Sequence, residues 1–386
     1  MTVSGPDRVG VGAELFSALT SLESRGIEIT DVAQITIRGA LVLCAEVSSR
    51  NAVTRAVIEE ALAQKDIVRN GISATVEEVT PSDVSDGRRL LITFLAPRIG
   101  ATQLASVFAA IADSGSTCER IVHLASYPVD CYELVVRSAD HASLRESLVE
   151  VARAAGVDLA VQRAGLHRRA KHLVVMDADS TLLQDEVIDL LAEECGCAAE
   201  VSAITELAMT GEIDFAEALR RRVALLAGLP VTVLDDVRSR LRLTPGARTL
   251  LRTLQRLGYV PAVVSGGFVE VLAPLMRELK VDYLAANRLE ILDDKLTGRL
   301  VGEIVDRAGK ANALRRFADE VGVPLEQTVA VGDGANDIDM LSASGLGIAF
   351  NAKPVVQEHA DAQLTVPYLD AVLYFLGISR EEIETV

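Results

Sequence analysis

The chain has 386 residues, of which 49% are hydrophobic, so it can build two or three domains with large cores and is too apolar to be disordered. Its net charge of −17 argues against a nucleic-acid binder or a membrane-surface binder, because both need a clustered basic face. With no apolar run near the ~20 residues of a spanning helix and no N-terminal signal pattern, we expect a cytoplasmic protein.

The first 165 residues contain two copies of one weak pattern. In the first copy a short strand ending in "SGPDRVG" precedes a helix over 11–26, strands over 27–39 and 40–49, a helix over 51–66 and a strand over 72–80. The second copy has a strand over 89–100, a helix over 101–115, strands over 116–126 and 131–140, a helix over 141–156 and a strand over 157–165. Both copies therefore predict a βαββαβ sandwich, which places domains at 1–84 and 88–165.

The element order and the turns "GPDRVG" and "APRIG" after each first strand resemble the ACT domain. This is a ferredoxin-like module that binds small metabolites, often amino acids, at interfaces between copies. The resemblance implies that Gly10 and Gly100 line ligand pockets; alternatively, both glycines only permit a tight turn. The first strand begins at Met1, and this truncation leaves ligand binding by the first copy open. Because exposed sheet edges in such modules usually pair, we expect a homodimer.

From about residue 166, after the basic linker "LHRRAKH", apolar strands alternate with helices, which predicts a parallel-sheet α/β domain over 170–386. Three strands end in reactive groups: "KHLVVMD" ends at Asp177, "YVPAVVSGG" at Ser265 and "TVAVGDGAND" at Asp333. In a parallel sheet these ends face the same carboxyl edge, where α/β sheets bind ligands.

Four carboxylates are expected at this edge, those of Asp177, Asp179, Asp333 and Asp337. A single aspartate after a strand is ordinarily a turn or helix cap, but four held close together repel each other and raise their pKa values unless a cation is present. Because the ligands are oxygens and no histidine cluster accompanies them, the pattern favours Mg²⁺.

Phosphate-binding groups accompany these acids: the Ser265 hydroxyl, free N–H groups at Gly266 and Gly267, and Lys310 in "DRAGKANAL" at a helix start. A lone lysine is usually solvated, and "SGG" alone is usually a turn. Together with the carboxylates they predict a site for phosphoryl oxygen.

In chain order, "DADST", "SGG", the isolated Lys310 and "GDGANDIDM" resemble the four motifs of the haloacid dehalogenase superfamily. The stretch from 170 to about 375 looks like its phosphoserine phosphatase branch. The resemblance implies that Asp177 is the nucleophile, which forms an aspartyl phosphate, and that Asp179 is the general acid and base. It also implies that Mg²⁺ is held by the carboxylates of Asp177 and Asp333 and by the backbone carbonyl of Asp179.

The same resemblance assigns supporting roles. Asp337 would orient metal-bound water or Lys310, and Asn336 would donate a hydrogen bond to the substrate. Lys310, together with Ser265 and the Gly266 amide, would neutralise the phosphoryl oxygens.

Residues 184–240 form a helical insertion that we expect to cover the carboxyl edge as a cap. Within it, Glu186 and Arg222 would match the ammonium and carboxylate of an amino-acid substrate, although alone each is ordinarily a helix-surface charge. The phosphoserine phosphatase branch has both at corresponding positions, and Met209 and Phe215 match its apolar residues that close over the substrate.

The remaining features are assigned to structure. The five cysteines give no disulfide framework, so we expect reduced thiols, and Cys195-Gly196-Cys197 lacks the partners of a metal site. The hairpin-like stretch 282–302 is expected to have no chemical role.

The leading hypothesis is a Mg²⁺-dependent phosphoserine phosphatase that acts in the last step of serine synthesis, with tandem ACT-like modules that sense an amino acid such as L-serine. One alternative is a phosphotransferase that uses the same intermediate but passes its phosphoryl group to homoserine. Another is a phosphatase for a different small phosphomonoester, which Glu186 and Arg222 disfavour. An inert amino-acid-binding protein is disfavoured by the intact motifs, and an ion pump by the lack of spanning helices.

Overall fold

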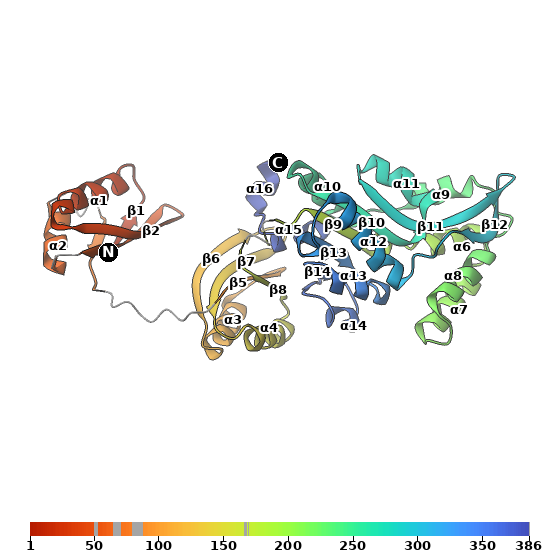
Figure 1. Cartoon of the computed structure of the whole chain (residues 1–386), viewed down its shortest axis with the longest axis horizontal. Coiled ribbons are helices and arrows are strands. Elements are labelled where there is room, and N and C mark those ends of the chain that lie inside the picture. Colours follow the sequence, from red (N-terminus) through yellow and green to blue (C-terminus); the bar gives the residue numbers. More distant parts are fainter. Residues whose placement is uncertain (50–52, 65–70, 79–87, 166–167, 169, 386) are drawn as a thin grey trace. The chain divides into compact units, whose positions relative to one another are not determined.

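The computed structural model describes residues 1–49, 53–64, 71–78, 88–165, 168 and 170–385, except the side chain of Met209. The chain divides into two compact units, Met1–Val84 and Ser85–Val386 (Figure 1). Among the described residues, no helix is long and apolar enough to cross a membrane.

The first unit is a single α+β sandwich. Its elements are β1 (Thr2–Pro6), α1 (Val11–Thr20), β2 (Ile27–Ile37), β3 (Ala40–Ser49), α2 (Arg55–Ala63) and β4 (Ser73–Thr75). The antiparallel sheet has the order β2-β3-β1-β4, and a core around Val3, Leu15, Leu43 and Ile58 lies between it and the two helices. The predicted βαββαβ order is confirmed.

The second copy has the same order within the second unit. It consists of β5 (Arg88–Ala96), α3 (Ala101–Asp113), β6 (Thr117–Ala125), β7 (Asp130–Ser138), α4 (His141–Ala155) and β8 (Asp158–Arg163). Its strands run in the order β8-β5-β7-β6, and α3 and α4 cover one face of them (Figure 1). Phe94, Leu134 and Leu144, each fully buried, fill the space between. Asp140 caps α4 by accepting hydrogen bonds from the N–H groups of its first turn.

The remainder of the second unit is a three-layer α/β/α domain, as predicted. Its strands are β9 (Leu173–Asp177), β10 (Val260–Phe268), β11 (Tyr283–Leu292), β12 (Lys295–Val301), β13 (Thr328–Gly332), β14 (Gly347–Phe350) and β15 (Ala362–Leu364), in the order β12-β11-β10-β9-β13-β14-β15. All neighbouring pairs are parallel except β11 with β12.

Alternate residues of the central strand β9 face opposite layers, so the strand is apolar throughout. Leu173 and Val175 pack with α12 (Arg307–Val321) and α13 (Ile338–Ala343). Val174 and Met176 pack with α10 (Ala247–Arg256) and α11 (Val269–Glu278). The sheet is therefore covered on both faces, and its carboxyl edge is left for ligands.

Four helices lie between β9 and α10: α6 (Val187–Cys195), α7 (Ala198–Met209), α8 (Phe215–Ala224) and α9 (Val233–Arg240). The chain segments that enter and leave this cap run side by side and are joined by an antiparallel bridge between Leu183 and Leu243. Next to the bridge, Asp185 and Arg242 form an ion pair with 2.6 Å between carboxylate and guanidinium. The two tethers of the cap are thus fixed to each other.

A feature that the sequence did not predict is the continuity of the two sheets in the second unit. β15 pairs antiparallel with β8 through Ala362 and Ala160, which makes one 11-stranded sheet. Around this bridge the Asp158 carboxylate accepts a hydrogen bond from the Thr365 N–H at 2.7 Å, and the Gln162 amide donates to the Phe375 carbonyl at 2.8 Å. The second sandwich and the α/β domain therefore share backbone and side-chain contacts.

The expectation of five reduced thiols is wrong for one pair. Cys195 and Cys197 form a disulfide at the turn between α6 and α7, with their Cα atoms 5.4 Å apart. Gly196 between them has a positive φ of 71°, which turns the chain so that both side chains meet. Cys44, Cys118 and Cys131 are free.

Candidate active site

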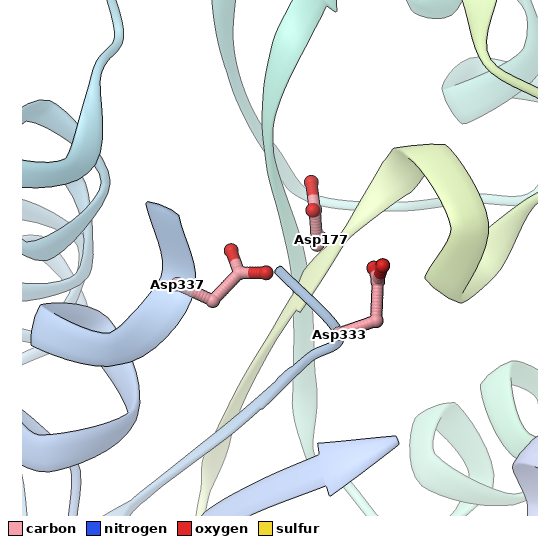
Figure 2. A group of neighbouring side chains, drawn as sticks. All are labelled: Asp177, Asp333 and Asp337. Atoms are coloured by element: carbon pink, nitrogen blue, oxygen red, sulfur yellow. The ribbon is translucent and has the colours of Figure 1, made fainter. Parts of the chain in front are cut away.

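Three neighbouring strands deliver the predicted groups to the carboxyl edge of the sheet. Asp177 ends β9, and because it pairs with Val264, Ser265 lies one residue beyond it on β10. Asp333 directly follows β13 on the other side. Figure 2 shows the side chains of Asp177, Asp333 and Asp337 converging, and one carboxylate oxygen from each lies within 4.8 Å of the others.

The turn after β9 fixes two of these carboxylates. The Asp177 Oδ1 accepts a hydrogen bond from the Ala178 N–H at 2.7 Å. The backbone of Ser180 has a positive φ of 57°, and it brings the buried Thr181 hydroxyl to 2.8 Å from the Asp333 Oδ1. Thr181 therefore holds the aspartate of a different strand. It stands inside the quoted "DADST", but no role was predicted for it.

Lys310, in the first turn of α12, is completely buried. Its Nζ lies 2.8 Å from the Asp177 Oδ2 and 2.7 Å from the Asp337 Oδ1. Burial alone would lower the pKa of Lys310, but the two carboxylates outweigh burial and raise it. The Asp337 Oδ2 accepts from the Gly334 N–H at 2.9 Å, so Asp337 is held behind the lysine.

The carboxyl groups of Asp177 and Asp333 have raised pKa values. Burial and then repulsion from Asp337 raise the pKa of Asp177 well above its ordinary value, although Lys310 opposes them. Burial raises the pKa of Asp333 to about 6, against the lowering effect of the Thr181 hydrogen bond. Closely spaced carboxylate oxygens with this cost of ionisation form a donor set that could hold a hard divalent metal ion.

Asp179 lies beside Ser265 in a hydrogen-bonded group. Its Oδ1 accepts from the Val187 N–H at 2.9 Å and its Oδ2 from the Ser265 hydroxyl at 2.8 Å. Burial raises the pKa of Asp179, and both hydrogen bonds oppose the shift. The Gly267 N–H donates to the Ser265 Oγ at 2.7 Å, so the prediction of a free N–H at Gly267 is wrong.

These groups line a cavity of about 150 Å³ under the cap. Its lining comprises Asp177, Asp179, Glu186, Ile188, Phe215, Leu219, Arg222, Gly266, Gly267, Lys310, Asp333, Gly334 and Asn336. Ser265 and Asp337 lie behind this surface, fully buried. A Cβ built on Gly266 would lie 3.2 Å from the Phe215 ring, so the absence of a side chain there lets the cap approach the sheet.

The cap supplies one carboxyl group and one guanidinium to the cavity. The Glu186 Oε1 accepts from the Ser180 hydroxyl at 2.7 Å, and burial followed by repulsion from Asp179 raises its pKa to about 7. The Arg222 guanidinium contacts the Thr205 hydroxyl at 3.4 Å. Burial lowers the pKa of Arg222, while the nearby Asp189 opposes the shift.

Three predicted residues lie elsewhere or are not fully described. The side chain of Met209, at the end of α7, is outside the described part of the chain. Gly10 and Gly100 precede α1 and α3 in the two sandwiches. Gly10 has a φ of 99°, which favours glycine at the turn itself, whereas the φ of −102° at Gly100 is open to any residue. Their ligand-binding role stays a prediction.

Comparison with known families agrees with this architecture. The family model of haloacid dehalogenase-like hydrolases matches residues 174–342. Two ACT-domain models match residues 1–69 and 91–162. The matched segments correspond to the α/β domain and to the two sandwiches.

Similar proteins extend this result along the whole chain. A phosphoserine phosphatase of Streptomyces coelicolor is 51% identical over 99% of this chain and 92% of its own length. Phosphoserine phosphatase SerB2 of Mycobacterium tuberculosis is 49% identical over 100% of this chain and 94% of its own. A crystal structure of a probable phosphoserine phosphatase from Vibrio cholerae, 32% identical, superimposes with a TM-score of 0.60 over 77% of this chain and 89% of that one. The chain therefore belongs to the phosphoserine phosphatase family of haloacid dehalogenase-like hydrolases, with two ACT domains ahead of the hydrolase domain.

Proposed function

We propose that the protein is a Mg²⁺-dependent phosphoserine phosphatase that hydrolyses O-phospho-L-serine to L-serine and phosphate, the final step of serine biosynthesis. The observation that carries the proposal is one small cavity with two chemically different ends. One end holds Asp177, Lys310 and Asp333, and the cap adds Glu186 and Arg222. A volume of about 150 Å³ suits a small phosphomonoester.

Mg²⁺ would be held by carboxylate oxygens of Asp177 and Asp333 and by the backbone carbonyl of Asp179. When bound, it supplies positive charge that offsets repulsion between the nucleophile and the anionic substrate. Asp337 contributes by fixing Lys310, whose ammonium neutralises the phosphoryl oxygens with the Gly266 amide. Ser265, buried behind the cavity surface, supports this end of the site through its hydrogen bond to Asp179.

In the first step a carboxylate oxygen of Asp177 attacks phosphorus, and the bond from phosphorus to the seryl oxygen breaks. Asp179 gives its proton to that oxygen, so serine leaves as an alcohol. The raised pKa of Asp179 supports this role, because the acid must hold a proton near neutral pH. In the second step Asp179 takes a proton from the water that attacks phosphorus, and the bond to Asp177 breaks.

Recognition of the amino acid falls to the cap. Ionised Glu186 pairs with the substrate ammonium and Arg222 with its carboxylate, while Phe215 and Met209 close over the carbon chain. Asn336, in the lining of the cavity, donates a hydrogen bond to the substrate.

The test is phosphate release from phosphoserine by the purified full chain. We expect release that requires Mg²⁺ and stops with EDTA, and we expect Asp177→Asn to abolish it. Asp235→Asn is the matched control, because Asp235 is exposed and pairs with Arg238 on the cap surface. Normal turnover by Asp177→Asn would overturn the mechanism, and phosphohomoserine formed in the presence of homoserine would reassign the enzyme as a phosphotransferase.

We also propose that an amino acid such as L-serine binds the ACT domains and changes this rate. The support is the match of both sandwiches to ACT-domain models. A homodimer through these domains is proposed because β2 lies at a sheet edge and its Ile35 and Ile37 are 49% and 62% exposed. Phosphate release with and without L-serine, and light scattering at micromolar concentration, test the two statements.

A further inference from the structure

Asn287 lies on β11, in the stretch that the sequence assigned to structure alone. Its side chain is 1% exposed, and both ends of its amide are hydrogen-bonded to backbone. The Nδ2 donates to the Gly266 carbonyl at 2.8 Å, and the Oδ1 accepts from the Val305 N–H at 2.8 Å. A buried amide is costly unless it is paired in this way.

The two partners lie next to Ser265 and to the start of the helix that carries Lys310. Gly266 follows Ser265 near the end of β10. Val305 precedes Asp306, which caps α12 by accepting from the Gly309 N–H at 2.8 Å and so begins the helix that carries Lys310. Asn287 therefore links the segment 265–267 of β10 to the start of the helix that carries Lys310.

The Asn287 side chain lies where the hydrogen-bond ladder between β10 and β11 is irregular. β10 and β11 pair regularly up to Val264, the register then shifts, and pairing resumes between Phe268 and Asn287. The three residues in between, 265–267, are the irregular part of β10 that borders the cavity. The Asn287 amide thus supplies a cross-strand hydrogen bond to this segment where the ladder is irregular.

The peptide between Gly266 and Gly267 is held at both of its polar atoms. Its carbonyl accepts from Asn287, and its N–H donates to the Ser265 Oγ, which in turn donates to the Asp179 Oδ2 at 2.8 Å. Glycines resist backbone rotation least, and a rotated peptide would point its carbonyl oxygen elsewhere and release Ser265. A fixed donor on a buried strand opposes that rotation.

We propose that Asn287 is a positioning residue for the phosphatase reaction, which acts through the Gly266–Gly267 peptide on Ser265 and the proton-donating Asp179. This inference rests on the proposed function. It assigns Asn287 no contact with the substrate, and it predicts a defect in protonation of the leaving group.

Asn287→Asp tests the donor specifically. It keeps the size of the side chain and the acceptor for Val305, but an ionised carboxylate would face the Gly266 carbonyl. We expect kcat for phosphoserine to fall about 10- to 100-fold with KM within about threefold, because losing a partner that orients a reacting group without touching the substrate typically costs this much. The ratio of variant to wild-type kcat should rise as pH falls, because the protonated carboxyl can donate to Gly266 again.

Asn287→Ala and a second substrate identify the path of the effect. p-Nitrophenyl phosphate has a leaving group that needs no proton, so its kcat should fall at least about fivefold less than that for phosphoserine. Asn287→Ala combined with Ser265→Ala should lose much less than the product of the single losses, because both act on one path. Glu290→Gln, on the same strand but bonded to Thr297 at the hairpin, is the control and should stay within about twofold of wild type.

Equal losses on both substrates, additive losses in the double variant, or full activity of both Asn287 variants would each overturn the proposal. Variants that are unfolded at the assay temperature would also overturn it, because Asn287 would then serve stability. If the wild type hydrolyses another alkyl phosphomonoester but not phosphoserine, the proposed function fails separately. The double-variant and pH tests on that alkyl ester, whose leaving group also needs a proton, then decide whether Asn287 acts through Ser265.

Discussion

The two ACT domains share one element order but differ in what their sheets join. In the first domain the strands close a separate four-stranded sheet over a separate core. In the second, β8 continues through Ala160 and Ala362 into the catalytic sheet. The same local pattern has thus produced one independent module and one module built into the enzyme.

The sheet faces opposite the helices show the same difference. In the first domain Ile35, Ile37 and Val42 on this face are 38% to 62% exposed. In the second domain Leu124 and Cys131 are buried in a core shared with the end of the hydrolase domain. The comparison teaches that the fold of a small module does not determine its role in stability. That role depends on which neighbour covers the face of the sheet opposite the helices.

The largest expected effect comes from truncation. A chain that begins at Arg88 should retain kcat within about twofold, because the first domain forms its own unit. A chain that begins at Ala170 should melt at least about 10 °C lower or aggregate, because its apolar C-terminal residues and the β15 edge lose their cover. Calorimetry and turnover measure both. Equal melting temperatures for the two truncations would remove the distinction between the domains.

A smaller effect should separate two glycines with the same backbone angle. Gly39 in the first domain and Gly377 at the end of the second unit both have a φ of +81°. An added Cβ meets nothing within 4 Å at Gly39, but at Gly377 it would lie 2.7 Å from the Arg168 guanidinium, which forms a buried ion pair with Glu133 of the second ACT domain.

We therefore expect Gly39→Ala to lower the free energy of unfolding by about 1 kcal/mol, through backbone strain alone. Gly377→Ala should cost about 3 kcal/mol, because displacing the guanidinium also weakens a buried charge pair. Denaturant unfolding of each unit gives both values. Equal costs would show that the ion pair adjusts freely and adds no rigidity between the second domain and the C-terminal segment.

The last expected effect appears only as pH changes, and it concerns Asp158, which accepts a hydrogen bond from the Thr365 N–H. Burial raises the pKa of Asp158 to about 6, against hydrogen bonds from Thr365 and Val366. Between about pH 4 and 6 the folded protein therefore keeps a proton that the unfolded chain has lost, so stability falls as pH rises through this range. The contribution, about 3 kcal/mol, is fully present below about pH 4 and lost above about pH 6.

Asp158→Asn should remove this contribution from the stability curve of the second unit. Asp31→Asn, at an exposed position on β2 of the first domain, is the matched control and should reproduce the wild-type curve. Chemical denaturation at pH 4, 5, 6 and 7 provides the measurement. If the Asp158→Asn variant and the wild type change in stability by the same amount between pH 4 and 6, burial at this junction does not control the dependence.

The sequence predicted what local patterns determine. Alternating apolar residues gave the two βαββαβ modules and the parallel strands, and strand ends brought Asp177, Ser265 and Asp333 to one edge. The fused sheet could not be predicted, because Ala160 and Ala362 are ordinary strand residues about 200 positions apart and neither carries a signal for the other.

Within the site, the prediction failed where hydrogen bonds connect separate segments. No role was predicted for Thr181, and Asn287 was placed in a hairpin-like stretch without a chemical role, yet each holds a group on another strand. The Gly267 N–H was expected to be free because a glycine loop often binds phosphate, but the neighbouring Ser265 hydroxyl accepts it. Such pairings depend on three-dimensional proximity, which spacing along the chain does not encode.

The pairing of the buried Lys310 with two carboxylates has a consequence for how the enzyme meets its substrate. A lysine whose pKa is raised above an already alkaline ordinary value keeps its ammonium form at every pH where the protein is folded and working. We therefore expect the charge of this residue to stay constant as acidity changes, so that variation of the rate with pH arises from other groups, among them the carboxyl groups around it and the phosphate of the substrate.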